Sequence, residues 1–195
     1  MSKRLTATSG FFLMLALLLY LDGGVLFWAA LSAALFHELA HYAAARTCGA
    51  TLHCLRLTAV GAEMELRSQI LTYPAELAIA AAGPLANLLL ALLLANLPAL
   101  PNRFLLAGVH LSLGVFNLLP VAPLDGSQIL RSALSALASP AWGQRCANAL
   151  SLLLSAVLVL FGIVAFLRGS NPSLLVTAFW LLSRNLPQKN RPCSR

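Results

Sequence analysis

The residues best suited to chemistry lie in the stretch 36–41, which has the pattern H-E-x-x-H from His37 to His41. Residues four apart share one face of a helix, so the imidazoles of His37 and His41 can bind one zinc ion. Glu38 follows the first histidine, where its carboxylate can take a proton from a zinc-activated water as general base. The pattern therefore predicts a centre for metal-assisted hydrolysis. The alternative is a hydrogen-bonded histidine pair that only stabilises helix packing.

A catalytic zinc ion usually has three protein ligands and one open position, so a third ligand is expected. The remaining acidic residues are Asp22, Glu63, Glu65, Glu76 and Asp125. Asp22 lies in a turn before the helix of the histidines and is too far from them. The three glutamates, Glu63, Glu65 and Glu76, belong to the cytoplasmic side of the expected membrane helices and are weaker candidates. Asp125 is therefore the best candidate for the third ligand.

The depth of Asp125 supports this choice. His37 lies about 18 Å past Val25, and Asn117 lies about 20 Å past Phe104, at 1.5 Å per helical residue. The stretch 117–126 then contains two prolines, which interrupt the helix and hold Asp125 near the level of the histidines. Broken helices at this depth survive only when packed in protein or lining a cavity. The alternative for Asp125 is a helix N-cap.

The composition indicates the environment in which these residues work. Of the 195 residues, 59% are hydrophobic and 10% are charged, with a mean hydropathy of +0.83. Soluble domains carry about a quarter charged residues, so a soluble globular protein is excluded, as is a disordered chain. Four cysteines are too few for a disulfide scaffold. The chain is expected to be an integral membrane protein, and its net charge of +7 is not an indication of nucleic-acid binding.

The apolar stretches predict an all-α polytopic membrane protein that forms a single domain over residues 1–195, with about six transmembrane helices. The first stretch is interpreted as a span and not as a cleaved signal. A small β-hairpin around Gly61 is expected between the second and third spans, because polar and apolar residues alternate there. A short interfacial helix is expected over residues 127–142. The expected spans are about 5–21, 25–45, 74–97, 104–119, 147–167 and 173–186.

The basic residues predict the orientation of the spans. With six crossings and both termini cytoplasmic, the inner segments carry eleven of the 13 Lys and Arg residues, and the outer ones carry Arg103 and Arg168. Basic residues concentrate in cytoplasmic segments. The charge pattern therefore favours this topology and supports a short sixth span. It places the protein in the cell membrane with the active site towards the cytoplasmic side.

Three motifs in the same order resemble the site-2 protease family of intramembrane zinc metalloproteases. The first is H-E-x-x-H at 37–41, the second is Gly-Pro-Leu-Ala-Asn at 83–87, and the third is N-x-x-P-x-x-P-L-D-G at 117–126. The resemblance covers about residues 11–135. No interval is long enough for a PDZ domain, and the chain ends soon after the sixth span, without a CBS domain. The compact layout is similar to the sporulation-type branch.

The resemblance implies that His37, His41 and Asp125 bind one Zn2+ per chain and that Glu38 is catalytic. It also implies that Asn87 and Asn117 help to hold the substrate backbone or the reacting carbonyl. The alternative for both asparagines is hydrogen bonding between helices.

The expected function is an intramembrane zinc metalloendopeptidase that hydrolyses peptide bonds of membrane-associated or single-span substrates. The expected partners are such a protein substrate and the lipid bilayer, without nucleic acid, and a regulatory partner is left open. A catalytically inactive zinc-binding membrane scaffold is the alternative. A prenyl-protein-processing type of metalloprotease is disfavoured, because no glutamate follows Glu76 to supply its third ligand.

Overall fold

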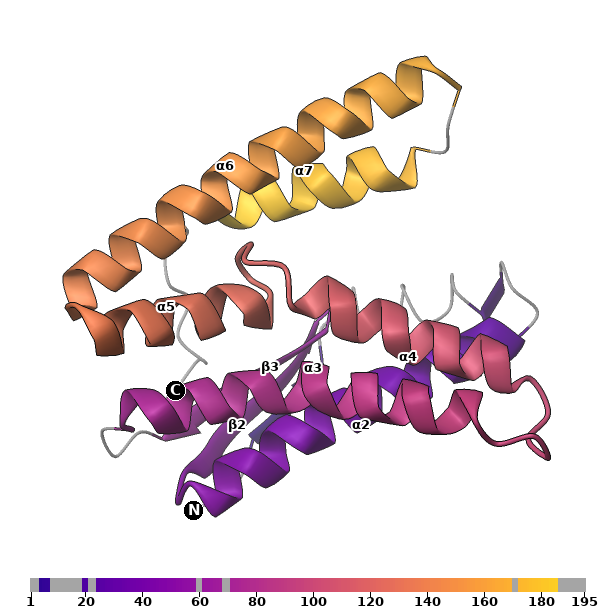
Figure 1. Ribbon diagram of the computed structural model, residues 1–195, viewed down its shortest axis with the longest axis horizontal. Coiled ribbons are helices and arrows are strands. Elements are labelled where there is room, and N and C mark those ends of the chain that lie inside the picture. The colour runs from indigo at the N-terminus through magenta and orange to yellow at the C-terminus, as the bar shows by residue number, and fades with distance from the viewer. Residues whose placement is uncertain are drawn as a thin grey trace. The chain divides into compact units, whose positions relative to one another are not determined.

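The computed structural model describes residues 4–7, 19–20, 24–58, 61–67, 71–169 and 172–185. The side chains of the strands, including Glu63 and Glu65, and all of Asp22 lie outside the described part. The chain divides into two compact units, Met1–Phe116 and Asn117–Arg195. The described elements are helical apart from three strands, and they are shown in Figure 1. The single domain over residues 1–195 stays a prediction.

In the first unit, helix α2 (Val25–Thr47) carries the H-E-x-x-H pattern and packs against α3 (Tyr73–Ala95), as Figure 1 shows. Its buried face repeats every four residues, which places the two histidines in line with three alanines: Ala29, Ala33, His37, His41 and Ala45. The small residues of this face allow α3 to approach closely. The histidines are therefore held against a neighbouring helix.

The face that α3 presents is also made of small or polar residues, namely Ala80, Gly83, Pro84, Asn87 and Ala91. The helix continues through Pro84, which has no N–H to donate to the preceding turn. Helix α4 (Arg103–Asn117) packs on the same region, since a side chain added at Gly114 would lie 3.1 Å from the Pro84 carbonyl oxygen. The three helices form the helical layer of the first unit.

The first unit also contains a three-stranded sheet, whose strands lie in the order β1-β2-β3. Strands β2 (Thr51–Thr58) and β3 (Gly61–Arg67) pair antiparallel, in the interval where the sequence predicts a hairpin. Strand β1 (Arg4–Ala7) pairs parallel with β2. The first predicted span therefore begins too early, because Leu5 to Ala7 satisfy their backbone groups by pairing with a neighbouring strand. The following residues 8–18 lie outside the described part.

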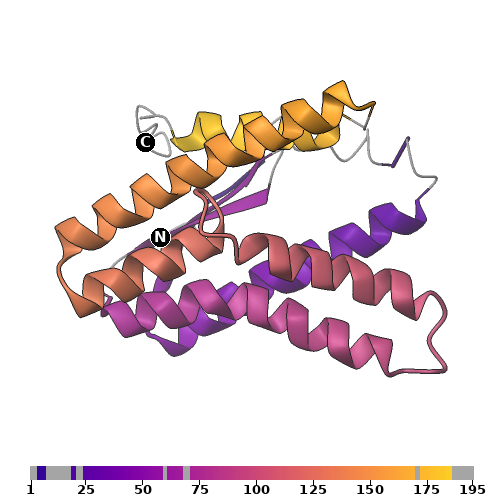
Figure 2. The same ribbon diagram turned by 45° about the horizontal axis from the view of Figure 1, so that its top comes forward.

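The second unit contains α5 (Asp125–Leu137), α6 (Pro140–Leu167) and α7 (Ser173–Asn185). Helix α6 packs against both of its neighbours, and it lies beside α7 in Figures 1 and 2. The predicted interfacial helix over 127–142 differs from this arrangement, because α5 ends at Leu137 and Trp142 belongs to α6. The physical reason is the cap at Ser139, whose side chain accepts a hydrogen bond from the Trp142 N–H at 3.3 Å, with Pro140 as the first helical residue.

Two of the described helices, α3 and α6, are long and apolar enough to cross a membrane, and α4 is a shorter apolar helix. Large apolar side chains cover their outer faces, including Leu89 on α3 and Leu160 and Phe161 on α6. The buried faces carry glycine, alanine and serine instead. A surface of this kind is suited to lipid and not to water.

Candidate metal centre

The two imidazoles of α2 face each other in the buried interior of the first unit. His37 and His41 are 5% and 8% exposed, and their Nε2 atoms lie 3.0 Å apart. Two nitrogens that bind one tetrahedral zinc ion at 2.0–2.1 Å are separated by about 3.4 Å. The pair is therefore within a few tenths of an ångström of the separation that a shared ion requires.

The orientation of the His41 ring is set by a backbone carbonyl of α3. Its Nδ1–H donates to the Ile79 oxygen at 2.7 Å. A carbonyl only accepts hydrogen bonds, so Nδ1 carries the proton and the lone pair of Nε2 is available for a metal. Metal-binding histidines commonly make this bond, which fixes both the tautomer and the plane of the ring.

The His37 ring is held by a buried amide and a second histidine. The Asn87 Nδ2 atom lies 3.2 Å from His37 Nδ1, and the Asn87 Oδ1 atom lies 3.0 Å from His110 Nδ1. Asn87 is 0% exposed and His110 is 3% exposed. With these atom positions, the His110 ring donates to the Asn87 oxygen and the Asn87 nitrogen donates to His37 Nδ1. The His37 proton then lies on Nε2, which donates to His41 Nε2.

Zinc binding by His37 Nε2 requires the opposite sense of donation in the same hydrogen bonds. The His37 proton must then lie on Nδ1 and be accepted by the Asn87 side-chain oxygen, while the amide nitrogen donates to His110 Nδ1. An amide can serve either sense by exchanging the positions of its oxygen and nitrogen. The residues around the two rings are thus compatible both with a histidine pair and with a metal centre.

Gly83 leaves the space that the two rings occupy. A Cβ atom added there would lie 2.7 Å from His41 Cε1 and 2.8 Å from His37 Cε1, and closer still to His41 Nε2. Real Cβ atoms essentially never approach other atoms below 3.0 Å. The first residue of the Gly-Pro-Leu-Ala-Asn motif is therefore a glycine because both imidazoles pass over its Cα atom.

In the second unit, Asp125 is the first residue of α5, after a loop that follows α4. Leu124 is the N-cap residue, so the N-cap alternative for Asp125 does not describe this geometry. Its carboxylate lies in the first turn, where the helix dipole favours a negative charge. Gly126 allows the loop to fold back, because a Cβ atom there would overlap the Leu118 carbonyl oxygen.

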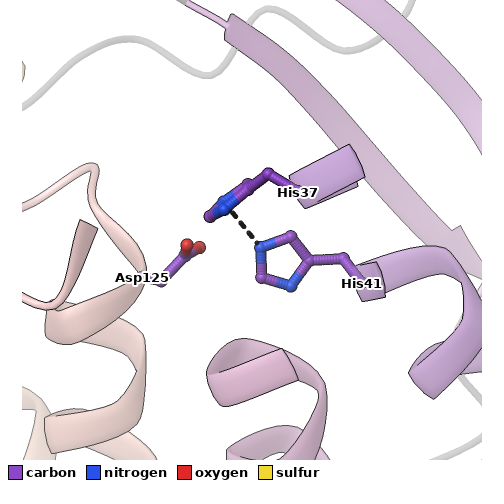
Figure 3. Close-up of side chains that lie close together, drawn as sticks. All are labelled: His37, His41 and Asp125. Atoms are coloured by element: carbon purple, nitrogen blue, oxygen red, sulfur yellow. Dashed lines mark hydrogen bonds between the residues drawn. The ribbon is translucent and has the colours of Figure 1, made fainter. Parts of the chain in front are cut away.

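Figure 3 draws three of the predicted site residues, His37, His41 and Asp125, and its dashed line marks the contact between the two imidazoles of α2. Two imidazole nitrogens and one carboxylate oxygen are the donor set of a catalytic zinc site with one open position. The chemistry of the described residues therefore fits zinc.

A polar cavity of about 380 Å³ lies in the second unit against Asp125. Its wall includes the side chains of Gln128, Arg131, Gln144 and Asn148. Arg131 and Gln144 come from α5 and α6 and lie within 3.4 Å of each other, Nη1 to Oε1. A cavity of this size and polarity can hold water beside the carboxylate.

The other predicted residues are placed as follows. Glu38 is half-buried on α2 beside His37, and Asn117 is the last residue of α4. Glu76 lies in the first turn of α3. His110 lies in an apolar helix, seven residues before Asn117, where the sequence favours a hydrogen-bonding helix residue over a metal ligand or a gate. Its contact with Asn87 agrees with that interpretation.

A family model supplies the decisive comparison. The model described as Peptidase family M50 matches residues 25–102 and 99–161, which include both histidines, Asn87 and Asp125. The chain belongs to peptidase family M50.

Two curated proteins resemble this M50 chain. Rip3 of Mycobacterium tuberculosis is 34% identical over 167 residues, which cover 77% of this chain and 40% of Rip3. The zinc metalloprotease MJ0392 of Methanocaldococcus jannaschii is 29% identical over 167 residues, which cover 79% of this chain and 49% of that protein. The chain therefore spans half or less of the length of these relatives.

A solved structure shows the fold of the M50 chain. The site-2 protease from Methanocaldococcus jannaschii matches with a TM-score of 0.71 and 22% identity, over 98% of this chain and 94% of the other. The resemblance that the three motifs predict is thus confirmed at the level of family and fold.

Proposed function

We propose that this chain is an intramembrane zinc metalloendopeptidase that hydrolyses peptide bonds of membrane-associated or single-span proteins. The observation that carries the proposal is the pair of buried imidazoles, His37 and His41, with their Nε2 atoms 3.0 Å apart. Membership of peptidase family M50 and the zinc metalloprotease MJ0392 as a relative support the same activity.

In this proposal His37, His41 and Asp125 hold one zinc ion per chain. The support for Asp125 is its place in the third motif, because a carboxylate oxygen with two imidazole nitrogens is the donor set of a catalytic zinc site. When bound, zinc polarises the scissile carbonyl and lowers the pKa of a water towards 7. Asp125 also supplies negative charge to a site that otherwise has two neutral ligands.

Glu38 is the proposed catalytic residue. Its carboxylate directly follows a ligand in the sequence, so it accepts the proton of the attacking water and later delivers it to the leaving amine. Peptide hydrolysis consumes one water for each bond cleaved, and a site among apolar helices must admit that water. The polar cavity beside Asp125 provides a place for water to enter.

Asn87 and Asn117 are proposed to hold the substrate backbone or the reacting carbonyl, as the family resemblance implies. Both polar atoms of the Asn87 amide contact histidines, His37 and His110. A substrate contact by Asn87 therefore requires the amide to share or exchange one of these partners. Its hydrogen bond to the His37 ring gives it a positioning role in addition.

The proposed topology has about six crossings in the cell membrane, with both termini and the active site towards the cytoplasm. The distribution of basic residues supports it. Helix α7 has 13 residues and rises about 20 Å. The hydrocarbon core of a bilayer is ~30 Å thick. A crossing by α7 therefore requires that residues next to the helix extend the span or that the bilayer becomes thinner around it. Labelling of Cys48 from the cytoplasmic face only would agree with the proposal, and labelling from the outer face only would contradict it.

The test of the proposed activity is the Glu38→Gln variant, purified with the wild type in detergent. We expect wild-type protein to copurify with about one zinc per chain and to cleave single-span test proteins. Glu38→Gln should retain the zinc and lose cleavage by about 10²–10⁴-fold, the usual contribution of a general base.

Glu76→Gln is the matched control, because Glu76 lies in the first turn of α3 and outside the three motifs. It should leave both zinc content and cleavage unchanged. Unaltered biological activity of Glu38→Gln would contradict the enzyme and support the zinc-binding scaffold.

A further inference from the structure

The loop that precedes Asp125 is held by side chains from two other helices of the second unit. The Ala122 N–H donates to the Ser151 Oγ atom of α6 at 2.7 Å. The Ala122 carbonyl accepts from the Asn185 side-chain nitrogen of α7 at 3.4 Å. Both backbone polar groups of a residue three positions before Asp125 are therefore bound by side chains more than 25 residues away in the sequence.

These side chains form one connected network. The Ser151 hydroxyl donates to the Asn185 side-chain oxygen. The Asn185 nitrogen donates to the Ser155 Oγ atom at 2.9 Å and to the Leu181 carbonyl oxygen of its own helix at 3.0 Å, so the Ala122 carbonyl shares one of its two hydrogens. Ser155 in turn donates to the Ser151 carbonyl oxygen at 2.8 Å. Ser151 and Ser155 are 1% and 0% exposed, whereas Ala122 and Asn185 are half-buried. A buried polar network with all members satisfied specifies one arrangement of the parts it joins.

The segment from Ala122 to Asp125 transmits this constraint over a short distance. The Leu124 N–H donates to the Val121 carbonyl oxygen at 2.9 Å, and the Ser127 hydroxyl donates to the Leu124 carbonyl oxygen at 2.8 Å. Val121 and Leu124 are both buried. The backbone between the network and Asp125 is therefore turned and packed, so a displacement of Ala122 moves the start of α5.

We propose that Ser151 and Asn185 are positioning residues for the metal centre, which act on Asp125 through the backbone of Ala122. The inference rests on the proposed role of Asp125 as third zinc ligand. Groups that hold a metal ligand in place without binding the metal themselves typically contribute 10–100-fold to metal affinity. Two polar residues in apolar helices, outside all three motifs, would then belong to the machinery of zinc binding.

The test measures zinc affinity of the full chain in detergent, by competition with a chelating dye. We expect Asn185→Leu and Ser151→Ala to weaken zinc binding by about 10–100-fold, while the metal-free variants keep wild-type helicity and unfold at a lower temperature, because buried hydrogen bonds are lost. The cobalt-loaded variants should show a shifted visible spectrum, because the carboxylate no longer binds in its native geometry. Ser183→Ala is the matched control, since its hydroxyl on α7 donates to the nearby Trp180 carbonyl oxygen of the same helix and not to the described loop before Asp125.

The outcomes separate this inference from the proposed function. Zinc affinities of both network variants within twofold of wild type would overturn the inference, and if Asn185→Leu does not fold, Ser151→Ala decides alone. If Asp125→Asn weakens zinc binding and the network variants do not, only the positioning role is wrong. If Asp125→Asn leaves zinc affinity unchanged, the ligand assignment itself is wrong, and the inference falls with it.

Discussion

The Gly83→Ala substitution tests whether the two histidines form a metal centre, and its effect can be worked out from the structure. The new Cβ atom would lie 2.7 Å from His41 Cε1 and 2.8 Å from His37 Cε1, whereas ordinary contact begins at 3.4 Å. The His37 ring must therefore retreat by about 0.6 Å and the His41 ring, whose Nε2 lies closer still, by more than 0.7 Å, several times the ~0.2 Å by which metal–ligand distances vary. If both rings move by this distance, their nitrogens can no longer bind the same metal ion.

The energetic cost follows from the packing of the site. Adding a methyl group to a well-packed interior costs about 1–3 kcal/mol, which corresponds to about 5- to 150-fold weaker zinc binding if the ion holds the rings in place. The backbone of α3 should not suffer, because alanine favours a helix over glycine by about 0.5–1 kcal/mol. Loss of affinity without loss of helicity is the expected result.

The assay is a zinc competition titration, with thermal unfolding of the metal-free protein recorded in parallel. Gly108→Ala is the control, because within the described part of the chain nothing beyond the neighbouring backbone of α4 itself lies within 4 Å of the corresponding Cβ position. It should leave zinc affinity unchanged. A zinc affinity of Gly83→Ala within twofold of wild type would refute the reasoning, since the rings would then not be bound where the structure has them.

Two further predictions address groups beyond the ligands. His110→Leu removes one partner of the buried Asn87 amide. The variant should bind zinc about tenfold more weakly, and cleavage by the zinc-saturated enzyme should be unchanged. If His110→Leu binds zinc as tightly as the wild type, His37 is not positioned through Asn87. Met64→Pro removes one backbone donor from β3, the edge strand of the described sheet, and should reduce cleavage several-fold with normal zinc content if extended substrates pair there. Unchanged cleavage would argue against strand addition.

The structure also decides where such a proline is best placed. The predicted hairpin around Gly61 offers two positions for a test of strand addition by an extended substrate, Leu57 before the glycine and Met64 after it. In the sheet, β2 is the central strand and Leu57 is paired with both Ala7 and Ala62. A proline at Leu57 would therefore disrupt the sheet itself, whereas β3 has only one described neighbour.

The histidine pair was predictable because it depends on one helix alone. Residues four apart meet on any helix, and α2 forms over the expected stretch. The contact from Asn87 to His37 was not predictable from spacing, because it depends on the relative shift of two helices whose residues are fifty positions apart. The motif indicated that Asn87 matters, and only the packing of α3 on α2 shows which atoms it contacts.

The boundary between α5 and α6 is marked in the sequence by a local capping pattern. Ser139 followed by Pro140 is a typical helix start, with a capping side chain and a proline at the first position. Ser151 and Asn185 offered no such signal. Serine and asparagine in apolar helices often bond their own preceding turn, so the sequence gives no reason to expect them to bind a loop 29 and 63 residues away.

The small size of the buried side chains sets an unusual rule for which substitutions the protein tolerates. Ala33 is 0% exposed and lies one turn before His37, so enlarging it would push α2 and α3 apart and separate Asn87 from the imidazole it supports. Leu89, on the opposite side of α3, is 68% exposed and can be exchanged for other bulky apolar residues at little cost. Sequence variation among functional versions of this chain should therefore concentrate at its largest side chains, the reverse of the pattern in a water-soluble enzyme.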